Sequence, residues 1–344
     1  MTIRDEIGES ADVVRRLASA GPAALEGFRG AAAKRHLSFA LIAARGTSDH
    51  AATYAQYVLG ARNRLPVGLA APSLSTVYGT PPRLADALVI GVSQSGRSPD
   101  VVAVVEDGRA QGALTLAITN DPASELARAA AFVLDLAAGP ERAVAATKTY
   151  VAELAAVALL SAALGADGDV GASPLIRIAD AIDAATAGEP DVAAVAADGG
   201  PDRCVVLGRG FQYPTAREWS LKLKEVAGIL ADPYSAADFE HGPITLVGEG
   251  FPVLAVATTG RALPGVVALL ERLAATGADL LIASDDRAVR GLGRHSIALP
   301  VGVPEWLAPI VAIVPAQLYA YHAALARGAD PERPRHLQKV TLTT

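Results

Sequence analysis

The sequence predicts an α/β protein with two tandem units, each a parallel sheet with helices on both faces. Three observations support this fold class. Of the 344 residues, 51% are apolar and only 5% are aromatic, a composition typical of small side chains packed between helices and a sheet. From Leu37 onward, short apolar runs alternate with helical segments, the pattern of a parallel sheet covered on both faces. Finally, strand ends recur at one fixed separation, which indicates a duplication.

The N-terminal residues 1–35 are predicted to form one or two helices, because apolar residues recur at helical spacing from Ile3 to Leu17. Gly21-Pro22 is expected to break this run. The strands expected in the first unit are Phe39–Ala43, Pro66–Ala70, Ala87–Val92, Leu114–Thr119 and Phe132–Leu136. A long helix is expected after them.

The duplication is visible at the ends of corresponding strands. Gly46 corresponds to Gly210 (210 − 46 = 164), and Gly96 corresponds to Gly260 (260 − 96 = 164). The length also favours about two domains. The expected divisions are a helical segment 1–35, a first unit 36–165, a connecting segment 166–200, a second unit 201–326 and a tail 327–344 that closes on a short strand.

Composition and charge exclude several classes of function. The net charge is −6 and lysines and arginines do not cluster, so we expect no nucleic-acid partner. No apolar run is recognised that reaches the roughly 18 to 20 residues of a membrane helix. The charged N-terminus does not resemble a secretory signal, so a cytoplasmic location is expected. The single Cys204 lies in a predicted buried strand, which argues against a disulfide, a thiolate metal site or a cysteine nucleophile.

Polar loops follow two predicted strands of the first unit, at Gly46-Thr47-Ser48 and at Ser93 to Ser98. Hydroxyls and free amides at helix N-termini can bind a phosphate dianion. Either loop alone is also typical of an ordinary helix cap. Because loops from two strands of one sheet should converge, we favour a monophosphate site. The Walker pattern and the dinucleotide fingerprint are missing from the sequence.

In the second unit, Pro214 is predicted to begin a helix on which Glu218, Lys222 and Glu225 share one stripe. A solvated helix face with one ion pair is the simpler interpretation. The apolar residues around the rest of the helix instead favour a largely buried helix whose carboxylate transfers protons. His241 lies in a turn beside acidic residues, a setting suited to proton transfer.

Together these segments resemble the sugar isomerase (SIS) family over residues 5–344. The resemblance is to the isomerase domain of glutamine:fructose-6-phosphate amidotransferase and to SIS-type glucosamine-6-phosphate deaminases. The motifs that carry it are Arg45-Gly-Thr-Ser, Ser93-Gln-Ser-Gly, Ala145-Ala-Thr-Lys-Thr, Leu207-Gly-Arg-Gly, Leu221-Lys-Leu-Lys-Glu225, His241-Gly-Pro and Lys339. It implies two tandem SIS subdomains, each with a flavodoxin-like parallel sheet.

The resemblance also implies roles for particular residues. Glu225 would move a proton between C1 and C2 of the sugar, with support from Lys222. His241 would open the sugar ring from the second subunit of a homodimer, and Lys339 would form a Schiff base with the open-chain ketose. The residues implied in phosphate and substrate binding are Gly46, Thr47, Ser48, Ser93, Gln94, Ser95, Ser98, Val144 and Ala145.

The implied activity is conversion of glucosamine 6-phosphate, or a close analogue, to fructose 6-phosphate and ammonia, without glutaminase activity and without a metal or redox cofactor. The loop from Ser235 to His241 is closer to the deaminase form, and Arg97 replaces an acid that is common in the family. The alternatives are an aldose-ketose phosphosugar isomerase, a deglycase, or a phosphosugar-binding regulator without catalysis.

Overall fold

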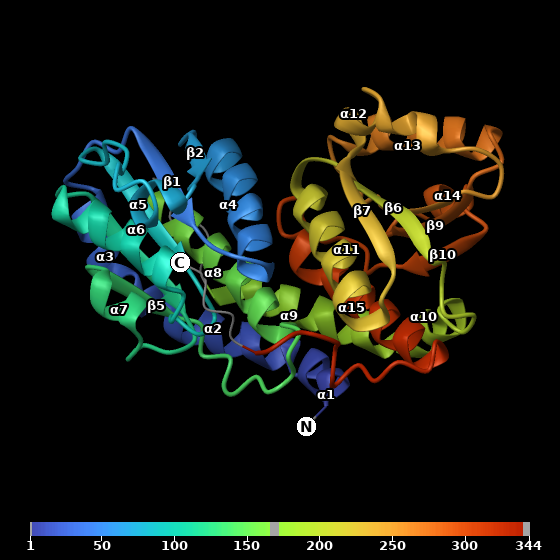
Figure 1. Ribbon diagram of the computed structural model, residues 1–344, viewed down its shortest axis with the longest axis horizontal. Helices are drawn as coiled ribbons and strands as arrows, with labels where there is room; N and C mark the ends of the chain where they lie inside the picture. Colours follow the sequence, from blue (N-terminus) through green and yellow to red (C-terminus); the bar gives the residue numbers. More distant parts are fainter. Residues whose placement is uncertain (1, 166–171, 340–344) are drawn as a thin grey trace. The chain divides into compact units, whose positions relative to one another are not determined.

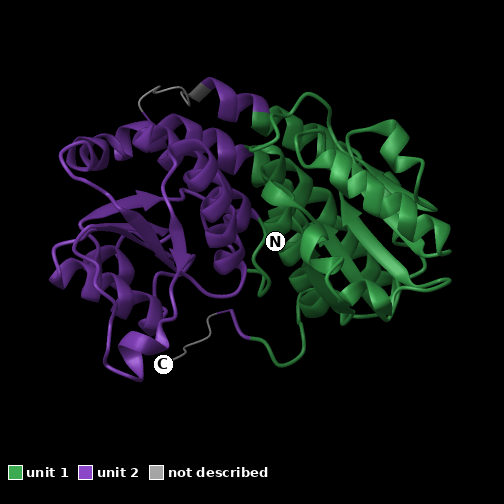
Figure 2. Cartoon of the chain, turned by 90° about the horizontal axis from the view of Figure 1, so that it is seen from above, with its two compact units in different colours: residues 1–11, 142–147, 178–337 green, residues 12–141, 148–177, 338–344 purple. Residues whose placement is uncertain are grey.

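The computed structural model describes residues 2–165 and 172–339. The chain folds into two compact units, coloured separately in Figure 2. Unit 1 comprises residues 1–11, 142–147 and 178–337, and unit 2 comprises residues 12–141, 148–177 and 338–344. Each unit contains one five-stranded sheet.

Unit 2 contains the first sheet, in the order β2-β1-β3-β4-β5 with every neighbouring pair parallel. The elements from Ser10 to Leu164 are α2 (Ser10–Ala24), α3 (Glu26–Ala32), β1 (Phe39–Ala43), α4 (Thr47–Asn63), β2 (Val67–Leu69), α5 (Ser73–Thr76), β3 (Ala87–Val92), α6 (Pro99–Ala110), β4 (Leu114–Thr119), α7 (Glu125–Ala129), β5 (Phe132–Asp135) and α8 (Lys148–Leu164). Helices α6 and α7 pack against the sheet through Val105 and Leu126. Helix α4 packs against β1, β2 and β3, and α8 packs against α4.

The second sheet lies in unit 1, in the order β10-β9-β8-β6-β7, again with parallel neighbours. The remaining elements are α1 (Ile3–Gly8), α9 (Ala172–Ala187), α10 (Glu189–Val195), β6 (Arg203–Gly208), η1 (Gly210–Gln212), α11 (Tyr213–Ala227), β7 (Leu230–Ser235), α12 (Ala236–Phe239), η2 (Pro243–Leu246), β8 (Pro252–Val256), α13 (Leu263–Ala275), β9 (Asp279–Ser284), α14 (Arg287–Arg290), β10 (His295–Ala298) and α15 (Ala308–Ala326). Figure 1 shows α12 and α13 on one side of this sheet and α15 on the other.

The two sheets have the same strand order once the labels are offset by five, so β6 corresponds to β1 and β8 to β3. This is the flavodoxin-like order. It confirms the predicted fold class of two duplicated parallel-sheet subdomains. The predicted bounds of β1, β3 and β4 also agree with the structure, because β1 and β3 are apolar throughout and β4 is interrupted only by the buried Thr115 before it ends at Thr119.

One expectation about a helix is wrong. Helix α2 does not break at Gly21-Pro22 but continues to Ala24, two residues beyond the proline. Helix α15 is a 19-residue apolar helix that is long enough to cross a membrane by length and composition, although 83% of its most apolar window is buried. It is apolar all round because it packs on several sides against neighbours in unit 1, including α11, α10 and α1. The short strand expected at the end of the tail lies outside the described residues.

Candidate functional site

The two polar loops of unit 2 follow β1 and β3, which are neighbours in the centre of the sheet. The chain leaves these strands in opposite directions across the sheet, and ligands of open parallel sheets bind at such a switch point. Gly46 has φ +55° and immediately precedes α4, whose first residue is Thr47. This left-handed conformation favours glycine and turns the chain directly from the strand into the helix.

The loop after β3 is stabilised by hydrogen bonds between its backbone amides and its own serine hydroxyls. The amide of Gly96 donates to Ser93 Oγ at 3.2 Å, and the amide of Arg97 donates to Ser95 Oγ at 3.3 Å. Gly96 has φ +62°, and a Cβ at this position would lie 2.1 Å from Ser124 Oγ. Only glycine fits this position, so the loop is held in one tight conformation around its hydroxyl groups.

Ser98 occupies the N-cap position of α6, yet among the described residues it makes no side-chain capping hydrogen bond. Ser124 is different, since its Oγ accepts a hydrogen bond from Ala127 N at 3.3 Å and caps α7. Ordinary capping therefore does not explain the Ser98 hydroxyl. Ser48 instead donates to Glu153 Oε1 at 2.7 Å in the interior, so its hydroxyl serves the packing of unit 2.

Two arginines flank these loops. Arg45 Nε lies 2.6 Å from Oδ2 of the buried Asp100, in the first turn of α6. This ion pair links the loop after β1 to the helix that follows β3. Arg97 lies 3.6 Å from Asp121, with 64% of its side chain exposed. Its guanidinium is therefore at the surface of the loop.

Replacing Ser98 with alanine should weaken phosphate binding without unfolding the protein. One hydrogen bond to a charged group contributes about 1.5 to 3 kcal/mol, so we expect the Kd for a phosphosugar to rise roughly 10- to 100-fold. Titration calorimetry measures this change. Asp286→Ala is the control: it removes the side-chain cap of α14 in unit 1 and should lower the thermal midpoint while the Kd stays near the wild-type value. An unchanged Kd in Ser98→Ala would exclude this hydroxyl from the site.

Helix α11 in unit 1 carries the predicted charged stripe. Pro214 lies in its first turn, and Gly228 ends it with φ +67°. The side chains of Glu218 and Lys222 are 0% and 1% exposed, whereas that of Glu225 is 21% exposed. The structure thus confirms a largely buried helix and excludes the simpler interpretation of a solvated face.

The three charges of α11 form one cluster. Lys222 Nζ lies 3.3 Å from Glu218 Oε1 and also donates a hydrogen bond to Glu225. Burial by itself lowers the pKa of Lys222, but the two carboxylates raise it above its ordinary value. Lys222 therefore remains an ammonium group, and it orients the carboxylate of Glu225. Within the cluster, Glu225 is the group that solvent or a ligand can reach.

His241 lies between α12 and η2, and within this single chain it is exposed to solvent. Its backbone amide donates to Asp238 O at 3.0 Å, which fixes the turn. The neighbouring Glu240 forms an ion pair with Arg272. The turn is thus ordered while the imidazole remains accessible.

The segment containing Val144 and Ala145 is positioned by a buried carboxylate. Glu6, which is 0% exposed, accepts hydrogen bonds from the amides of Arg142 and Ala143, the latter at 3.1 Å. Ala145 is buried and Val144 is partly exposed. The backbone here is held in place from α1, so the predicted sugar contact rests on an ordered segment.

Lys339 lies in unit 2, where its Nζ is 3.0 Å from Glu141 Oε2. Glu141 also accepts hydrogen bonds from Thr149 Oγ1 at 2.6 Å and from Thr149 N at 3.2 Å. The side chain of Glu141 is 0% exposed and that of Lys339 is 26% exposed. A buried carboxylate thus holds the amine at the end of the described chain.

The sequence analysis did not assign Glu6 or Glu141 to the site. Glu6 is separated by 136 residues from Arg142, and Glu141 by 198 residues from Lys339, so no local spacing connects them. One signal was available for Glu141: it follows a proline, and Pro304-Glu305 repeats this pair at the same offset of 164 (305 − 141) as the strand ends.

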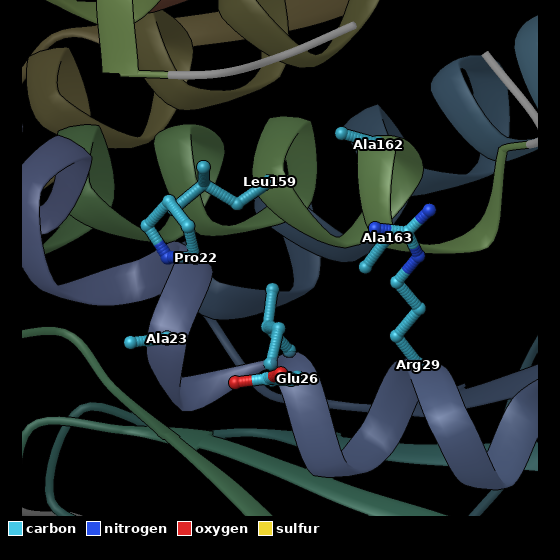
Figure 3. A pocket seen from close by; sticks show the side chains of 8 residues that line it. Pro22, Ala23, Glu26, Arg29, Leu159, Ala162 and Ala163 are labelled. Carbon is cyan, nitrogen blue, oxygen red and sulfur yellow. The ribbon is translucent and has the colours of Figure 1, made fainter. Parts of the chain in front are cut away.

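A separate hollow of about 340 Å³ lies in unit 2 between α2, α3 and α8. Figure 3 shows Glu26 and Arg29 on α3 and Leu159 on α8 around it. Its described lining includes no residue of the predicted site. The hollow therefore contributes nothing to the arrangement above.

The single cysteine is not a nucleophile. Cys204 lies in β6 and is 3% exposed, and burial raises the pKa of its thiol to about 12. The thiolate required for nucleophilic attack is therefore scarce at neutral pH. In residues 2–165 and 172–339, no group of three or more histidine, cysteine, aspartate or glutamate side chains could hold a metal ion.

Fold and geometry together define a duplicated α/β protein with polar loops at two strand ends in one unit and a buried acid-lysine-acid cluster in the other. The model of the SIS domain family matches residues 38–163 and 200–327. The chain belongs to the SIS domain family, which confirms the resemblance found in its sequence motifs.

Three known proteins show the extent of the similarity. The glutamine–fructose-6-phosphate aminotransferase [isomerizing] of Pyrococcus horikoshii is 34% identical over 305 residues, 87% of this chain and 51% of that protein. This chain thus spans about half the length of the curated relatives it matches. A structure of a candidate phosphosugar isomerase from Silicibacter pomeroyi has a TM-score of 0.84 and 34% identity, covering 96% of this chain and 100% of that chain. The C-terminal domain of glucosamine-fructose-6-phosphate aminotransferase from Francisella tularensis has a TM-score of 0.84 and 25% identity, covering 96% and 98%.

Proposed function

We propose that this chain is a phosphosugar isomerase that deaminates glucosamine 6-phosphate, or a close analogue, to fructose 6-phosphate and ammonia. We also propose that it acts in the cytoplasm as a homodimer. Family membership and the similarity to named phosphosugar enzymes support the general class. The finer assignment rests on the chemistry of the described residues.

The observation that carries the proposal is the cluster on α11. Glu225 is partly exposed, and its carboxylate is oriented by Lys222, which is itself buried and paired with Glu218. A fixed carboxylate with one accessible face can remove a proton from one carbon and return it to the next. A protein that only bound a phosphosugar would have no need for such a group.

In the proposed reaction, the loops after β1 and β3 bind the phosphate. His241, contributed by the second subunit, moves a proton from O1 to the ring oxygen and so opens the ring. Glu225 removes the proton from C2 and delivers it to C1 through an enolamine, which leaves an imine at C2. Water adds to this imine and ammonia leaves, so that one glucosamine 6-phosphate and one water give one fructose 6-phosphate and one ammonia.

Lys339 offers a second route for the last step. Glu141, at 3.0 Å from its Nζ, accepts a proton from the ammonium group, and the neutral amine adds to the C2 imine. Ammonia leaves and a Schiff base to Lys339 remains, which water then hydrolyses to the ketose. Glu141 thereby acts as a positioning and proton-accepting group for Lys339.

Two features favour ammonia as a product. The amine of an amino sugar is carried on C2, where the α11 carboxylate would act. The loop from Ser235 to His241, which is closer to the deaminase form, agrees with this direction.

The test is incubation of the purified protein with glucosamine 6-phosphate while ammonia and fructose 6-phosphate are measured together. We expect the two products in equal amounts. Release of a ketose phosphate only from an aldose phosphate would favour the isomerase alternative, and release only from a sugar-amine adduct would favour a deglycase. Binding of the phosphosugars without turnover of any of them would contradict the enzymatic proposal and favour a regulator.

A further inference from the structure

The loop after β8 in unit 1 is the counterpart of the proposed phosphate loop. Strand β8 corresponds to β3 in the duplicated sheet order, and both strands lead through a loop into a long helix. Ala262 is the N-cap of α13 and lies 164 residues after Ser98 (262 − 98), which is the N-cap of α6. The second half thus repeats the strand, loop and helix N-terminus that would bind the phosphate in the first half.

A carboxylate of the chain itself occupies this second loop. The amide of Ala262 donates to Glu305 Oε1 at 3.3 Å. A Cβ built on Gly260 would lie 2.2 Å from Glu305 Cδ and 2.4 Å from its Oε1. The Glu305 carboxylate therefore rests against the glycine of the loop and on the N-terminus of α13, where an anion is stabilised by free amides and by the helix dipole.

Little space remains beside this carboxylate. The hollow bordered by Glu305, Arg209 and Thr258 has a volume of about 10 Å³, which is close to the minimum for a single water molecule. Gln212 Nε2 donates to Thr258 Oγ1 at 3.0 Å, and the Arg209 guanidinium lies 2.9 Å from the position of a Cβ on Gly265. Donor groups suited to an anion are thus gathered here, but no room is left for a phosphate.

The counterpart of Glu305 in the first half behaves differently. Glu141 lies 164 residues earlier and also follows a proline. Its carboxylate accepts hydrogen bonds from Thr149 and pairs with Lys339. In the first half, this glutamate is Glu141, which binds Thr149 and Lys339. In the second half it is Glu305, which reaches the loop after β8.

We propose that Glu305 is a built-in anion that closes the second-half counterpart of the phosphate loop, and that loss of its side chain opens a second site for a phosphate monoester or inorganic phosphate. The inference rests on the proposed function in one respect, because the first-half loop is taken as the phosphate site. It accounts for why only one of the two halves would bind the phosphate.

The experiment is a titration of inorganic phosphate into the full chain by calorimetry, comparing the wild type with Glu305→Ala. We expect one phosphate per chain in the wild type and two in Glu305→Ala. An unchanged stoichiometry in a folded Glu305→Ala protein overturns the inference. If the wild type binds no phosphate, the proposed function is contradicted. The inference can still be tested in that case, because it predicts that Glu305→Ala binds one phosphate where the wild type binds none.

A second pair of variants tests the position of Glu305 without any ligand. Gly260→Ala should lower the thermal midpoint of the wild type, because its Cβ collides with the Glu305 carboxyl group, and should have no effect in the Glu305→Ala background. An equal loss in both backgrounds overturns the inference. If Glu305→Ala fails to fold by circular dichroism, Glu305→Ser takes its place, because it also removes the carboxylate and leaves room in the loop. A folded Glu305→Ser chain that binds no second phosphate overturns the inference.

Discussion

Glu225→Gln is expected to reduce kcat for deamination of glucosamine 6-phosphate by roughly 10²- to 10⁴-fold, the usual contribution of a positioned general acid-base group. Glutamine keeps the shape of the side chain and an oxygen that accepts the hydrogen bond from Lys222, but it cannot take the proton from C2. Steady-state assays of ammonia release measure the effect. KM should change little, because the phosphate is bound elsewhere.

The control for this prediction is Glu271→Gln, which alters an exposed glutamate on α13 and should leave kcat at the wild-type value. Circular dichroism should show that both variants are folded. A Glu225→Gln protein with wild-type turnover would remove Glu225 from the role of the base, although the phosphosugar assignment would stand.

Lys222→Met is expected to destabilise the protein by about 3 to 5 kcal/mol, the usual cost of removing one partner of a buried ion pair. Glu218 is 0% exposed and would lose its ion pair with the Lys222 ammonium group. The free energy of unfolding from urea denaturation measures the loss. Lys224→Met, two residues along α11 and exposed, should cost less than about 1 kcal/mol.

A double variant separates charge from packing in this cluster. If the loss in Lys222→Met comes from the lost ion pair with Glu218, Glu218→Gln in the same chain should restore part of the stability, since the effects of directly interacting residues are not additive. Equal stability of Lys222→Met and the wild type would contradict the cluster as a structural unit.

The contribution of Lys222 to stability should be lost in the alkaline range. The folded-state pKa of Lys222 is raised above 10.5, so the stabilising contribution is fully present below 10.5 and is lost as the pH rises through the folded-state value. The difference in free energy of unfolding between the wild type and Lys222→Met should therefore be constant from pH 7 to pH 10 and fall above that range. A decline already at neutral pH would show that the lysine is not held as a cation.

The fold could be predicted from the sequence because its signals are local. Strand β3 is one apolar run that is followed by Ser93, and α11 combines Pro214 in its first turn with Gly228 at its end. Strand β7 was missed, since it contains Asp232 and Pro233. It lies at the edge of its sheet, where a missing backbone donor is tolerated. Helix α15 was missed because a helix apolar on all sides has no amphipathic pattern.

The site could be predicted only in part, because some of its contacts join residues that are far apart in the sequence. Loop residues such as Ser98 can be recognised from the sequence because they come after a predicted strand. Glu225 can be recognised by its spacing from Lys222. The engagement of Ser48 by Glu153, and of Lys339 by Glu141, connects residues 105 and 198 positions apart. Such pairs are set by tertiary packing, which no local spacing reveals.

The most direct test of the central claim follows the hydrogen on C2. Glucosamine 6-phosphate carrying deuterium at C2 should be converted by the wild type to fructose 6-phosphate with part of the deuterium at C1, because one carboxylate removes and returns the same proton. Mass spectrometry and nuclear magnetic resonance locate the label. The account predicts that the wild type releases ammonia and ketose with deuterium transferred from C2 to C1, and that this transfer is lost in Glu225→Gln. Release of ammonia with the deuterium still at C2, or no reaction of the amino sugar, would contradict the account.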